Sequence, residues 1–300
     1  MLEVLPRLLP AVIGMAGGFL LRRLGAADHR DGDFVFKLVF YVCLPALMFN
    51  ALSSVDLTRA LAIFPLAALV MVATGFVAGR IIAGRVRRPA TETAVLLVAC
   101  MSVNTGFELP FVQALYGADG VARIAAFDSV NTTLTFSWAY YVAARGNPQH
   151  TGGSLLLDRL LKSPPLYAIA AGLPINLLNL HVPSAISGPI GAFGATTAVL
   201  ISLGVGILFE PPGERLGRAA LIVGSRLVTG LAVAIAVVLI FRLHGIDRTV
   251  MLLMGVTPVA FVTVTFASLE NLDVRLAVNA LSMSLVSGLV LSLGITLFAG

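Results

Sequence analysis

Long apolar runs separated by short polar connections dominate the sequence. Ten runs can be placed, and each is close to the roughly 20 residues that an α-helix needs to cross a bilayer. They cover residues 4–24, 34–54, 60–83, 92–116, 121–144, 164–181, 187–209, 218–242, 249–269 and 274–298. The pattern predicts an all-α integral membrane protein with ten transmembrane helices.

Composition supports the bilayer as the solvent of this chain. Of its 300 residues, 58% are hydrophobic and 12% are charged, whereas a soluble domain carries about 25% charged residues. The net charge of +5 is spread over short connections between apolar runs, so a nucleic-acid partner is excluded. Arg22 and Arg23 follow the first apolar run instead of preceding it, which predicts a retained helix and not a secretory signal.

The positions of Lys and Arg predict the orientation in the membrane. Alternate connections, beginning with the one after the first run, hold fourteen basic residues: Arg22, Arg23, Arg30, Lys37, Arg80, Arg85, Arg87, Arg88, Arg145, Arg159, Lys162, Arg215, Arg218 and Arg275. The opposite side holds five: Arg7, Arg59, Arg123, Arg242 and Arg248. We therefore expect a multi-pass protein of the cytoplasmic membrane with both termini outside.

The longest connection divides the chain into two halves. Residues 1–144 and 164–300 hold five runs each, and residues 145–163 connect them on the cytoplasmic side. The leucines between Ser154 and Lys162 predict a short amphipathic helix at the membrane surface, with a plain tether as the alternative. Because five is odd, the second half starts on the opposite side, so related halves would form an inverted repeat.

A repeated spacing suggests that the halves are related. Pro110 is followed 21 residues later by Asn131, and Pro258 is followed 21 residues later by Asn279. Each asparagine also follows a valine. On this basis we expect Pro110 to be equivalent to Pro258, and Asn131 to Asn279.

Polar and helix-breaking residues interrupt the fourth run near its centre. They are Asn104, Thr105, Gly106, Glu108 and Pro110. Proline removes a backbone donor and glycine loosens a helix, and the freed backbone groups cannot face lipid. The fourth run is therefore predicted to be two half-helices whose break is buried in protein or lines a watery cavity.

The ninth run carries a milder interruption at Gly255, Thr257 and Pro258. Two breaks that cross would present helix N-termini to anions and unwound carbonyls to cations. The alternative is a pair of ordinary proline kinks. We expect the substrate site to be formed by Asn104, Thr105, Gly106, Pro110, Asn131, Thr257, Pro258 and Asn279.

Two acidic residues lie within apolar runs. Glu108 could couple transport to protons, bind a cation or contact the substrate, or it could be a protonated carboxyl that satisfies loose backbone. Asp128 lies one helical turn from Asn131 on the same face. We assign Glu108 and Asp128 to ion or proton coupling. Asn131 and Asn279 could either line a cavity or hold helices together.

Arg226 is a basic residue inside the eighth run. It lies eight residues beyond Arg218, roughly 12 Å along a helix. It would bind a carboxylate of the substrate or extend its side chain to the cytoplasmic interface.

Signatures of enzymes and metal sites are missing from the sequence. All four histidines fall in connections or at the ends of runs, and no phosphate-binding GxxxxGK[ST] occurs. The two cysteines, Cys43 and Cys100, lie in separate apolar runs. We expect no catalysis, no bound metal and no cofactor; Na+ and H+ are candidate coupling ions, and a uniporter would need neither.

Several motifs resemble those of the auxin efflux carrier family, in its bacterial form. They are Phe36–Ser53, Asn104–Phe107 followed by Leu109-Pro110, Asp128–Asn131, Ser163–Asn176 and Pro258. Their order along the chain covers nearly its whole length. The chain departs from the family in having the single residue Glu108 where two residues commonly separate the Phe from the Leu-Pro.

The resemblance implies a ten-helix inverted-repeat carrier with a scaffold domain and a transport domain that holds both crossover helices, the fourth and the ninth. It implies a small organic anion as substrate, moved by alternating access, and a homodimer that pairs through its scaffold halves. The acidic Glu108 would also be compatible with a cationic or zwitterionic substrate. The same features could belong to a sodium-coupled carrier of the bile-acid symporter type or to a membrane sensor derived from a transporter.

Overall fold

The computed structural model describes residues 4–54, 61–86, 88–147, 164–211, 213 and 216–299. Apart from one isolated β-bridge, the regular structure of these residues is helical. Five helical stretches among them are long and apolar enough to cross a membrane: His29–Ser54, Ile63–Arg85, Ser184–Leu208, Leu216–Ile240 and Val274–Phe298. This confirms a multi-pass helical membrane protein. The amphipathic helix expected at Ser154–Lys162 lies outside the described residues.

The first half of the chain runs from α1 to α7. Its elements are α1 (Val4–Arg23), α2 (His29–Leu38), the π-helical turn η1 (Val39–Cys43), α3 (Leu44–Ser54), α4 (Ile63–Arg85), α5 (Ala90–Met101), α6 (Thr105–Leu134), the π-helical turn η2 (Thr135–Ala139) and α7 (Tyr140–Gly146). Within α6, Gly117 has a φ of 53°, which glycine adopts without a steric penalty. The backbone reverses there, so α6 holds the end of the fourth predicted run and the start of the fifth.

The second half of the chain runs from α9 to α15. Its elements are α9 (Pro164–Leu177), α10 (Ser184–Ala195), α11 (Thr197–Leu208), α12 (Leu216–Ile240), α13 (Gly245–Val256), α14 (Phe261–Leu269) and α15 (Val274–Ala299). The described helices of the two halves fall on all ten predicted runs. Helix boundaries differ from the predicted ones by a few residues, as is usual for helix ends.

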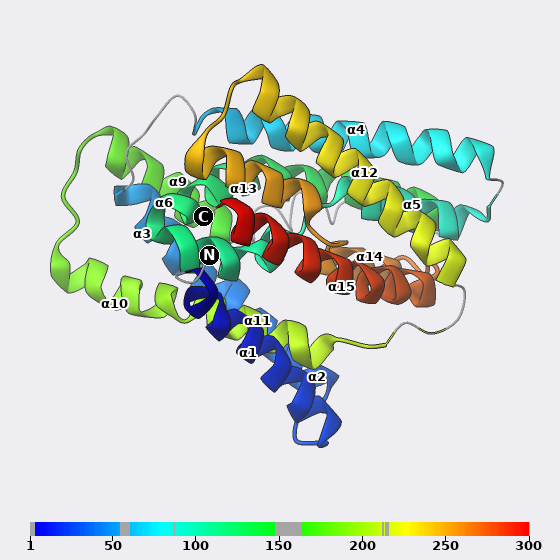
Figure 1. The fold of residues 1–300 in the computed structure, drawn as a ribbon, viewed down its shortest axis with the longest axis horizontal. Coiled ribbons are helices and arrows are strands. Elements are labelled where there is room, and N and C mark those ends of the chain that lie inside the picture. The colour runs from blue at the N-terminus through cyan, green and yellow to red at the C-terminus, as the bar shows by residue number, and fades with distance from the viewer. Residues whose placement is uncertain are drawn as a thin grey trace.

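The helices pack as two groups, and both groups draw on both halves of the chain. In the first, α1 packs on α11, α3 packs on α9 and α10, and α2 packs on α11. In the second, α4 packs on α5, α6 and α12, and α12 packs on α13 and α15. Helix α6 also touches α3 and α11, so it lies where the groups meet. Figure 1 shows α1, α2 and α11 on one side of the molecule and α4 and α12 on the other, with α15 between them.

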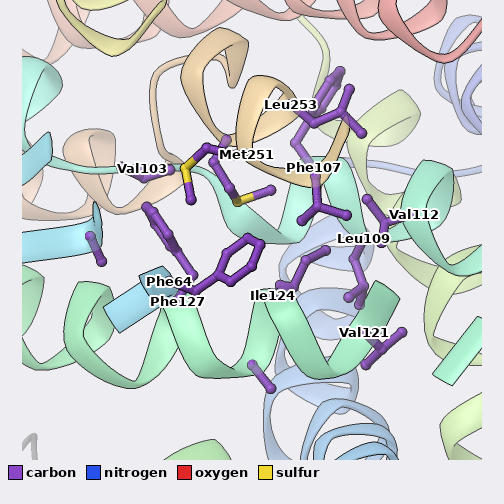
Figure 2. Packing of buried hydrophobic residues seen from close by; sticks show 14 of the residues in the cluster. Phe64, Val103, Phe107, Leu109, Val112, Val121, Ile124, Phe127, Met251 and Leu253 are labelled. Atoms are coloured by element: carbon purple, nitrogen blue, oxygen red, sulfur yellow. The ribbon is translucent and has the colours of Figure 1, made fainter. Parts of the chain in front are cut away.

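A buried apolar cluster surrounds the gap between α5 and α6. Phe64 of α4, Phe127 of α6 and Met251 of α13 lie around Val103, and all four side chains are buried. Figure 2 shows these side chains converging from separate helices. A packed core on this scale holds the irregular backbone at Val103 in one conformation, because dense interiors deform little.

Ion pairs connect helix ends that the alternation of runs places on the same side of the membrane. At one end, Arg218 at the start of α12 pairs with the buried Glu92 at the start of α5. At the other end, Arg123 of α6 pairs with Asp247 at the start of α13. The pairing agrees with helices that run alternately up and down through the fold.

Candidate functional site

Two helical breaks meet in the middle of the second helix group. Helix α5 ends at Met101 and α6 begins at Thr105, while α13 ends at Val256 and α14 begins at Phe261. The extended residues between them pair through an antiparallel β-bridge that joins Val103 to Val259. Both breaks are therefore irregular backbone buried in protein, which is the setting that a membrane-embedded protein requires.

Asn104 connects the two breaks. Its Oδ1 accepts a hydrogen bond from the backbone N–H of Phe107 at 3.3 Å, so the side chain caps the N-terminus of α6. Its Nδ2 donates to the carbonyl oxygen of Val259 at 3.1 Å. One buried side chain thus stabilises the start of a half-helix in the first half and the unwound backbone of the second.

Asp128 and Asn131, on the later part of α6, bond the residues of the first break. The Asn131 amide bonds both polar atoms of Val103: Nδ2 donates to the carbonyl oxygen at 3.2 Å, and Oδ1 accepts from the N–H at 3.4 Å. Asp128 Oδ1 accepts from Thr105 and Asn131, and its Oδ2 accepts from Thr132, each at 2.9 Å. Asp128 and Asn131 therefore lie at the break, where they fix its backbone.

Different side chains hold the second break. Ser284 of α15 accepts a hydrogen bond from the N–H of Val259 at 3.0 Å. Arg226 of α12 donates from Nη2 to the hydroxyl of Thr257 at 2.5 Å and to the carbonyl oxygen of Met254 at 3.4 Å. Arg226 is 2% exposed, so the interpretation that it extends to the membrane surface is wrong. The physical reason is that the open end of α13 supplies oxygen acceptors next to it.

Glu108 is completely buried on the first turn of α6. Its Oε1 accepts a hydrogen bond from Ser292 of α15 at 2.8 Å, and its Oε2 has no hydrogen-bond partner among the described residues. The only hydrogen-bond partner described for this carboxyl is thus a side chain, not the loose backbone of the break. A buried carboxyl with a free oxygen can hold a proton or accept a further hydrogen bond.

Gly106 borders open space at the same place. A β-carbon built on this residue would approach only Asn104 Oδ1, at 3.9 Å. The first turn of α6 is therefore accessible from one side, next to the N-terminus that Asn104 caps.

Two predicted site residues lie away from the breaks. Pro110 is inside α6, whereas Pro258 lies in the gap between α13 and α14, so the two prolines are not equivalent. Asn279 accepts a hydrogen bond from the N–H of Gly213 at 2.9 Å and lines a polar cavity of about 550 Å³ together with Arg275. The counterpart of Asn131 in bonding a break is Ser284, not Asn279.

Close helix contacts indicate another relation between the halves. A β-carbon on Gly75 of α4 would lie 2.1 Å from the carbonyl oxygen of Cys100 in α5. A β-carbon on Gly230 of α12 would lie 2.3 Å from the carbonyl oxygen of Gly255 in α13. Both residues of the second pair follow those of the first by 155 positions. The same close approach therefore recurs in front of each break.

A repeated dipeptide in the sequence has the same spacing of 155 positions, which differs from the spacing of the two prolines. Thr74-Gly75 and Thr229-Gly230 are the same dipeptide, 155 positions apart. The same offset makes Met71 the equivalent of Arg226. Arg226 is thus a charged residue in the second half where the first half has an apolar one.

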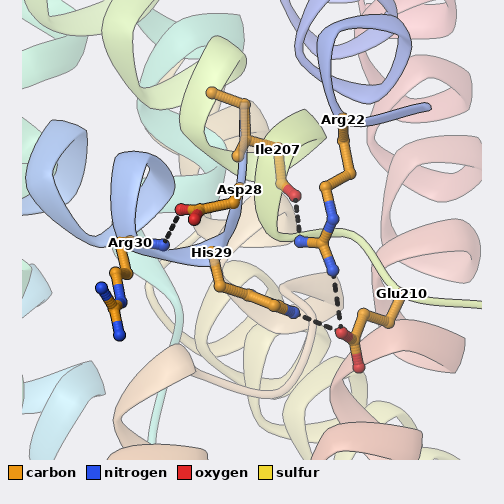
Figure 3. Close-up of polar contacts among 6 residues, drawn as sticks. All are labelled: Arg22, Asp28, His29, Arg30, Ile207 and Glu210. Carbon is orange, nitrogen blue, oxygen red and sulfur yellow. Dashed lines mark hydrogen bonds and ion pairs between the residues drawn. The ribbon is translucent and has the colours of Figure 1, made fainter. Parts of the chain in front are cut away.

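A polar cluster lies at the end of α1, away from the breaks. Glu210, just after α11, accepts hydrogen bonds from Arg22 at 3.2 Å and from His29, and Arg22 also donates to the carbonyl oxygen of Ile207 at 3.1 Å (Figure 3). Asp28 caps α2 by accepting from the N–H of Arg30 at 2.7 Å. The hydrogen bond from His29, with smaller contributions from the charge of His29 and from Arg22, keeps the pKa of Glu210 below its usual value against the opposing effect of partial burial.

An apolar cavity separates the two helix groups beside the first break. It has a volume of about 290 Å³ and is lined by Phe19 of α1, Phe209 after α11, Leu289 of α15 and Phe107, the residue next to Glu108. Among the described residues, no group of three or more His, Cys, Asp or Glu side chains could hold a metal ion.

Comparison with known proteins agrees with this architecture. An uncharacterized transporter of Methanothermobacter thermautotrophicus is 28% identical over 282 residues, covering 91% of each chain. An uncharacterized transporter of Methanocaldococcus jannaschii is 22% identical over 278 residues, covering 88% of each chain. The family described as "Membrane transport protein" matches residues 4–154. The chain belongs to this family of membrane transporters, the family of the auxin efflux carriers, as the motifs of its second, fourth and fifth runs predicted.

Proposed function

We propose that this protein is a secondary transporter that carries a small organic anion across the membrane by alternating access. The observation that carries the proposal is the bridge between Val103 and Val259, which joins two broken helices at one point. Broken helices that meet inside a bundle are how many secondary carriers build a substrate site without exposing backbone to lipid.

The electrostatics of the meeting point favour an anion. The N-termini of α6 and α14 both begin at the breaks, and a helix N-terminus carries about half a positive charge. Asn104 and Gly106 lie at the first of these ends, beside open space. The buried guanidinium of Arg226 adds a full positive charge at the second break. A carboxylate is the natural ligand of such a site.

The two helix groups supply the moving parts. We propose that α1, α2, α3, α9, α10 and α11 form a scaffold and that α4–α7 with α12–α15 carry the substrate. The paired close contacts at Gly75 and Gly230 support two related halves of opposite orientation. The apolar cavity beside Phe107 lies between the groups, so relative movement of the groups would change its shape.

Glu108 is a better candidate for proton coupling than Asp128. Both oxygens of Asp128 accept hydrogen bonds that hold the break together, whereas Glu108 Oε2 has no partner among the described residues. A group that changes protonation during transport must be able to exchange partners, and of these two acids only Glu108 has that freedom.

The test is solute-driven current in proteoliposomes of purified protein, screened against small carboxylates. We expect a saturable, carboxylate-dependent current that Asn104→Ala abolishes, because the variant loses both the α6 cap and the bond to Val259. Asn179→Gly is the matched control, since Asn179 is an exposed turn residue with a φ of 51°, which glycine tolerates. Carboxylate binding without current would instead indicate a sensor. A current carried by amines alone would refute the proposal that the substrate is an anion.

A further inference from the structure

Arg226 is bound to the end of a half-helix deep inside the protein. Its Nη2 donates to the carbonyl oxygen of Met254, in the last turn of α13, and to the hydroxyl of Thr257, the first residue of the second break. Carbonyls in the last turn of a helix lack intrahelical partners and carry partial negative charge. The guanidinium therefore occupies the negative end of α13.

The space for this guanidinium is built into the contact between α12 and α13. A β-carbon on Gly230, one turn after Arg226 on the same helix, would lie 2.1 Å from Arg226 Nη1 and 2.3 Å from the carbonyl oxygen of Gly255. The absence of a side chain at Gly230 lets α13 approach α12 while leaving room for the charged group. The packing of α12 against α13 therefore leaves a space that the Arg226 guanidinium fills.

The charge of Arg226 is not neutralised by a contacting acid. Among the described residues, the ion pairs within 4.0 Å do not include Arg226, and its buried Nε has no hydrogen-bond partner. A buried cation without an acid in direct contact is costly, and it persists where oxygen dipoles, a more distant charge such as that of Glu108, or a ligand compensate it. The end of α13 supplies those dipoles.

The ends of unwound helices are where sodium-coupled carriers hold their cation, because carbonyl and hydroxyl oxygens converge there. In this chain the oxygens of Met254 and Thr257 are already bonded to Arg226. The equivalent residue of the first half is the apolar Met71, 155 positions earlier, so the built-in cation belongs to the second break alone.

We propose that the Arg226 guanidinium is a resident cation that takes the place of a bound sodium ion at the second break. This inference rests on the proposed carrier function, and it specifies the coupling: the anion is taken up without sodium at the end of α13. The positive charge that a coupling ion would bring with the substrate is permanently present in the protein.

The first test compares NaCl with choline chloride at equal ionic strength. For the wild-type protein we expect the same carboxylate-driven flux and the same midpoint of thermal unfolding in both salts. Sodium-dependent stabilisation of the wild type that Thr257→Val abolishes would overturn the proposal, because it would place sodium at this helix end. Absence of flux for every carboxylate would refute the carrier function, but the unfolding measurement needs no flux and still tests the resident cation.

The second test removes the guanidinium. In Arg226→Ser we expect flux to fall roughly 10- to 100-fold, the effect of losing charge-assisted hydrogen bonds. Added sodium or guanidinium ions should raise the unfolding midpoint of this variant, since the vacated oxygens can bind them. Arg248→Ser, at an exposed arginine of α13, should show neither effect. No response of Arg226→Ser to either cation would contradict the proposal.

A conservative variant covers the case in which Arg226→Ser does not fold. Arg226→Lys keeps a cation at the end of α13 but offers fewer, differently placed donors. We expect it to fold, to transport at a reduced rate and to remain independent of sodium. A sodium requirement in Arg226→Lys, with its charge retained, would show that charge replacement is not the role of this residue.

Discussion

The two helical breaks have similar backbone geometry and different chemical support. At the first, the amide of Asn131 bonds both polar atoms of Val103 from within the same half of the chain. At the second, Ser284 accepts from the N–H of Val259, while the carbonyl oxygen of Val259 accepts from Asn104 of the other half. The side chain that bonds Val103 thus comes from the same half, whereas Val259 is bonded by one side chain from each half.

The breaks also differ in charge. The first is bonded by neutral side chains and by Asp128, and the second by the cation Arg226. The two breaks therefore share a similar backbone path while different side chains support them. Asn104 and Asn131 hold the backbone of the breaks in position, and Arg226 supplies a positive charge.

The largest expected effect comes from filling the close contacts that the halves share. Gly75→Val and Gly230→Val would place a β-carbon against the carbonyl oxygens of Cys100 and Gly255. Overpacking of this kind costs roughly 1–3 kcal/mol and sometimes more, so we expect a clear loss of monodisperse protein in size-exclusion chromatography for both variants.

Each glycine has a matched control on its own helix. Gly84 of α4 and Gly224 of α12 have nothing within 4 Å of a β-carbon, so Gly84→Ala and Gly224→Ala should be neutral or slightly stabilising. If Gly75→Val is tolerated while Gly230→Val is not, the close contacts of the two halves are not equivalent.

The next effect separates the two ways of holding a break. Asn131→Ala leaves the N–H of Val103 without its partner, whereas the carbonyl oxygen of Val103 still accepts from the N–H of Thr105 at 3.1 Å. Ser284→Ala likewise leaves one N–H, that of Val259, without its partner. Each stranded buried N–H costs about 1–3 kcal/mol, and Asn131→Ala also loses its bonds to the Val103 carbonyl and to Asp128, so it should lower the thermal unfolding midpoint more. Equal midpoints would mean that Val103 finds different partners when Asn131 is removed.

A smaller effect on stability, but a distinct effect on transport, is expected at Glu108. Glutamine mimics the protonated acid and can still accept a hydrogen bond from Ser292. Glu108→Gln should therefore fold normally and carry substrate at all pH values as the wild type does at acidic pH, which flux measurements across a pH series would show. Asp119→Asn, at an exposed residue of α6, is the control. An unchanged pH response would leave Glu108 with a structural role.

The smallest effect is expected at Glu210, far from both breaks. Its pKa is lowered chiefly by the hydrogen bond from His29 and less by Arg22, so the contact stabilises the protein above the usual carboxyl pKa of about 4.3. That contribution is lost as pH falls through the lowered pKa. Exposed pairs of this kind contribute at most about 1 kcal/mol and are screened by salt.

Unfolding midpoints followed from about pH 7 to below the usual carboxyl range would measure this contribution. The wild type should lose more stability on acidification than Glu210→Gln, and the difference should shrink at high salt. A variant that loses as much stability as the wild type would show that Glu210 does not anchor α1 and α2 to the segment after α11.

The positions of the helices could be predicted because run length and hydropathy are local properties. The first break could also be predicted, since Asn104, Gly106 and the residues around them disfavour a continuous helix inside a membrane. The expected equivalence of Pro110 and Pro258 was wrong. Proline is compatible both with the interior of α6 at Pro110 and with the gap at Pro258, so its spacing does not fix equivalence.

Arg226 shows why part of the site could not be predicted. An arginine in an apolar run can reach the membrane surface or turn inward, and the choice depends on acceptors far along the chain, here at Met254 and Thr257. Likewise, the partner of Glu108 is Ser292, 184 residues away. Contacts of this range follow from packing, which periodicity does not reveal.

The reversal at Gly117 has a mechanical consequence. The two arms of α6 are joined by a very short turn, and Thr105 on one arm is bonded to Asp128 on the other at 2.9 Å. The two arms cannot move apart at the end far from Gly117 without breaking this hydrogen bond. Because Asn131 on the second arm also bonds both backbone polar atoms of Val103, we expect the two arms and the three residues Ser102–Asn104 to move as one stiff unit.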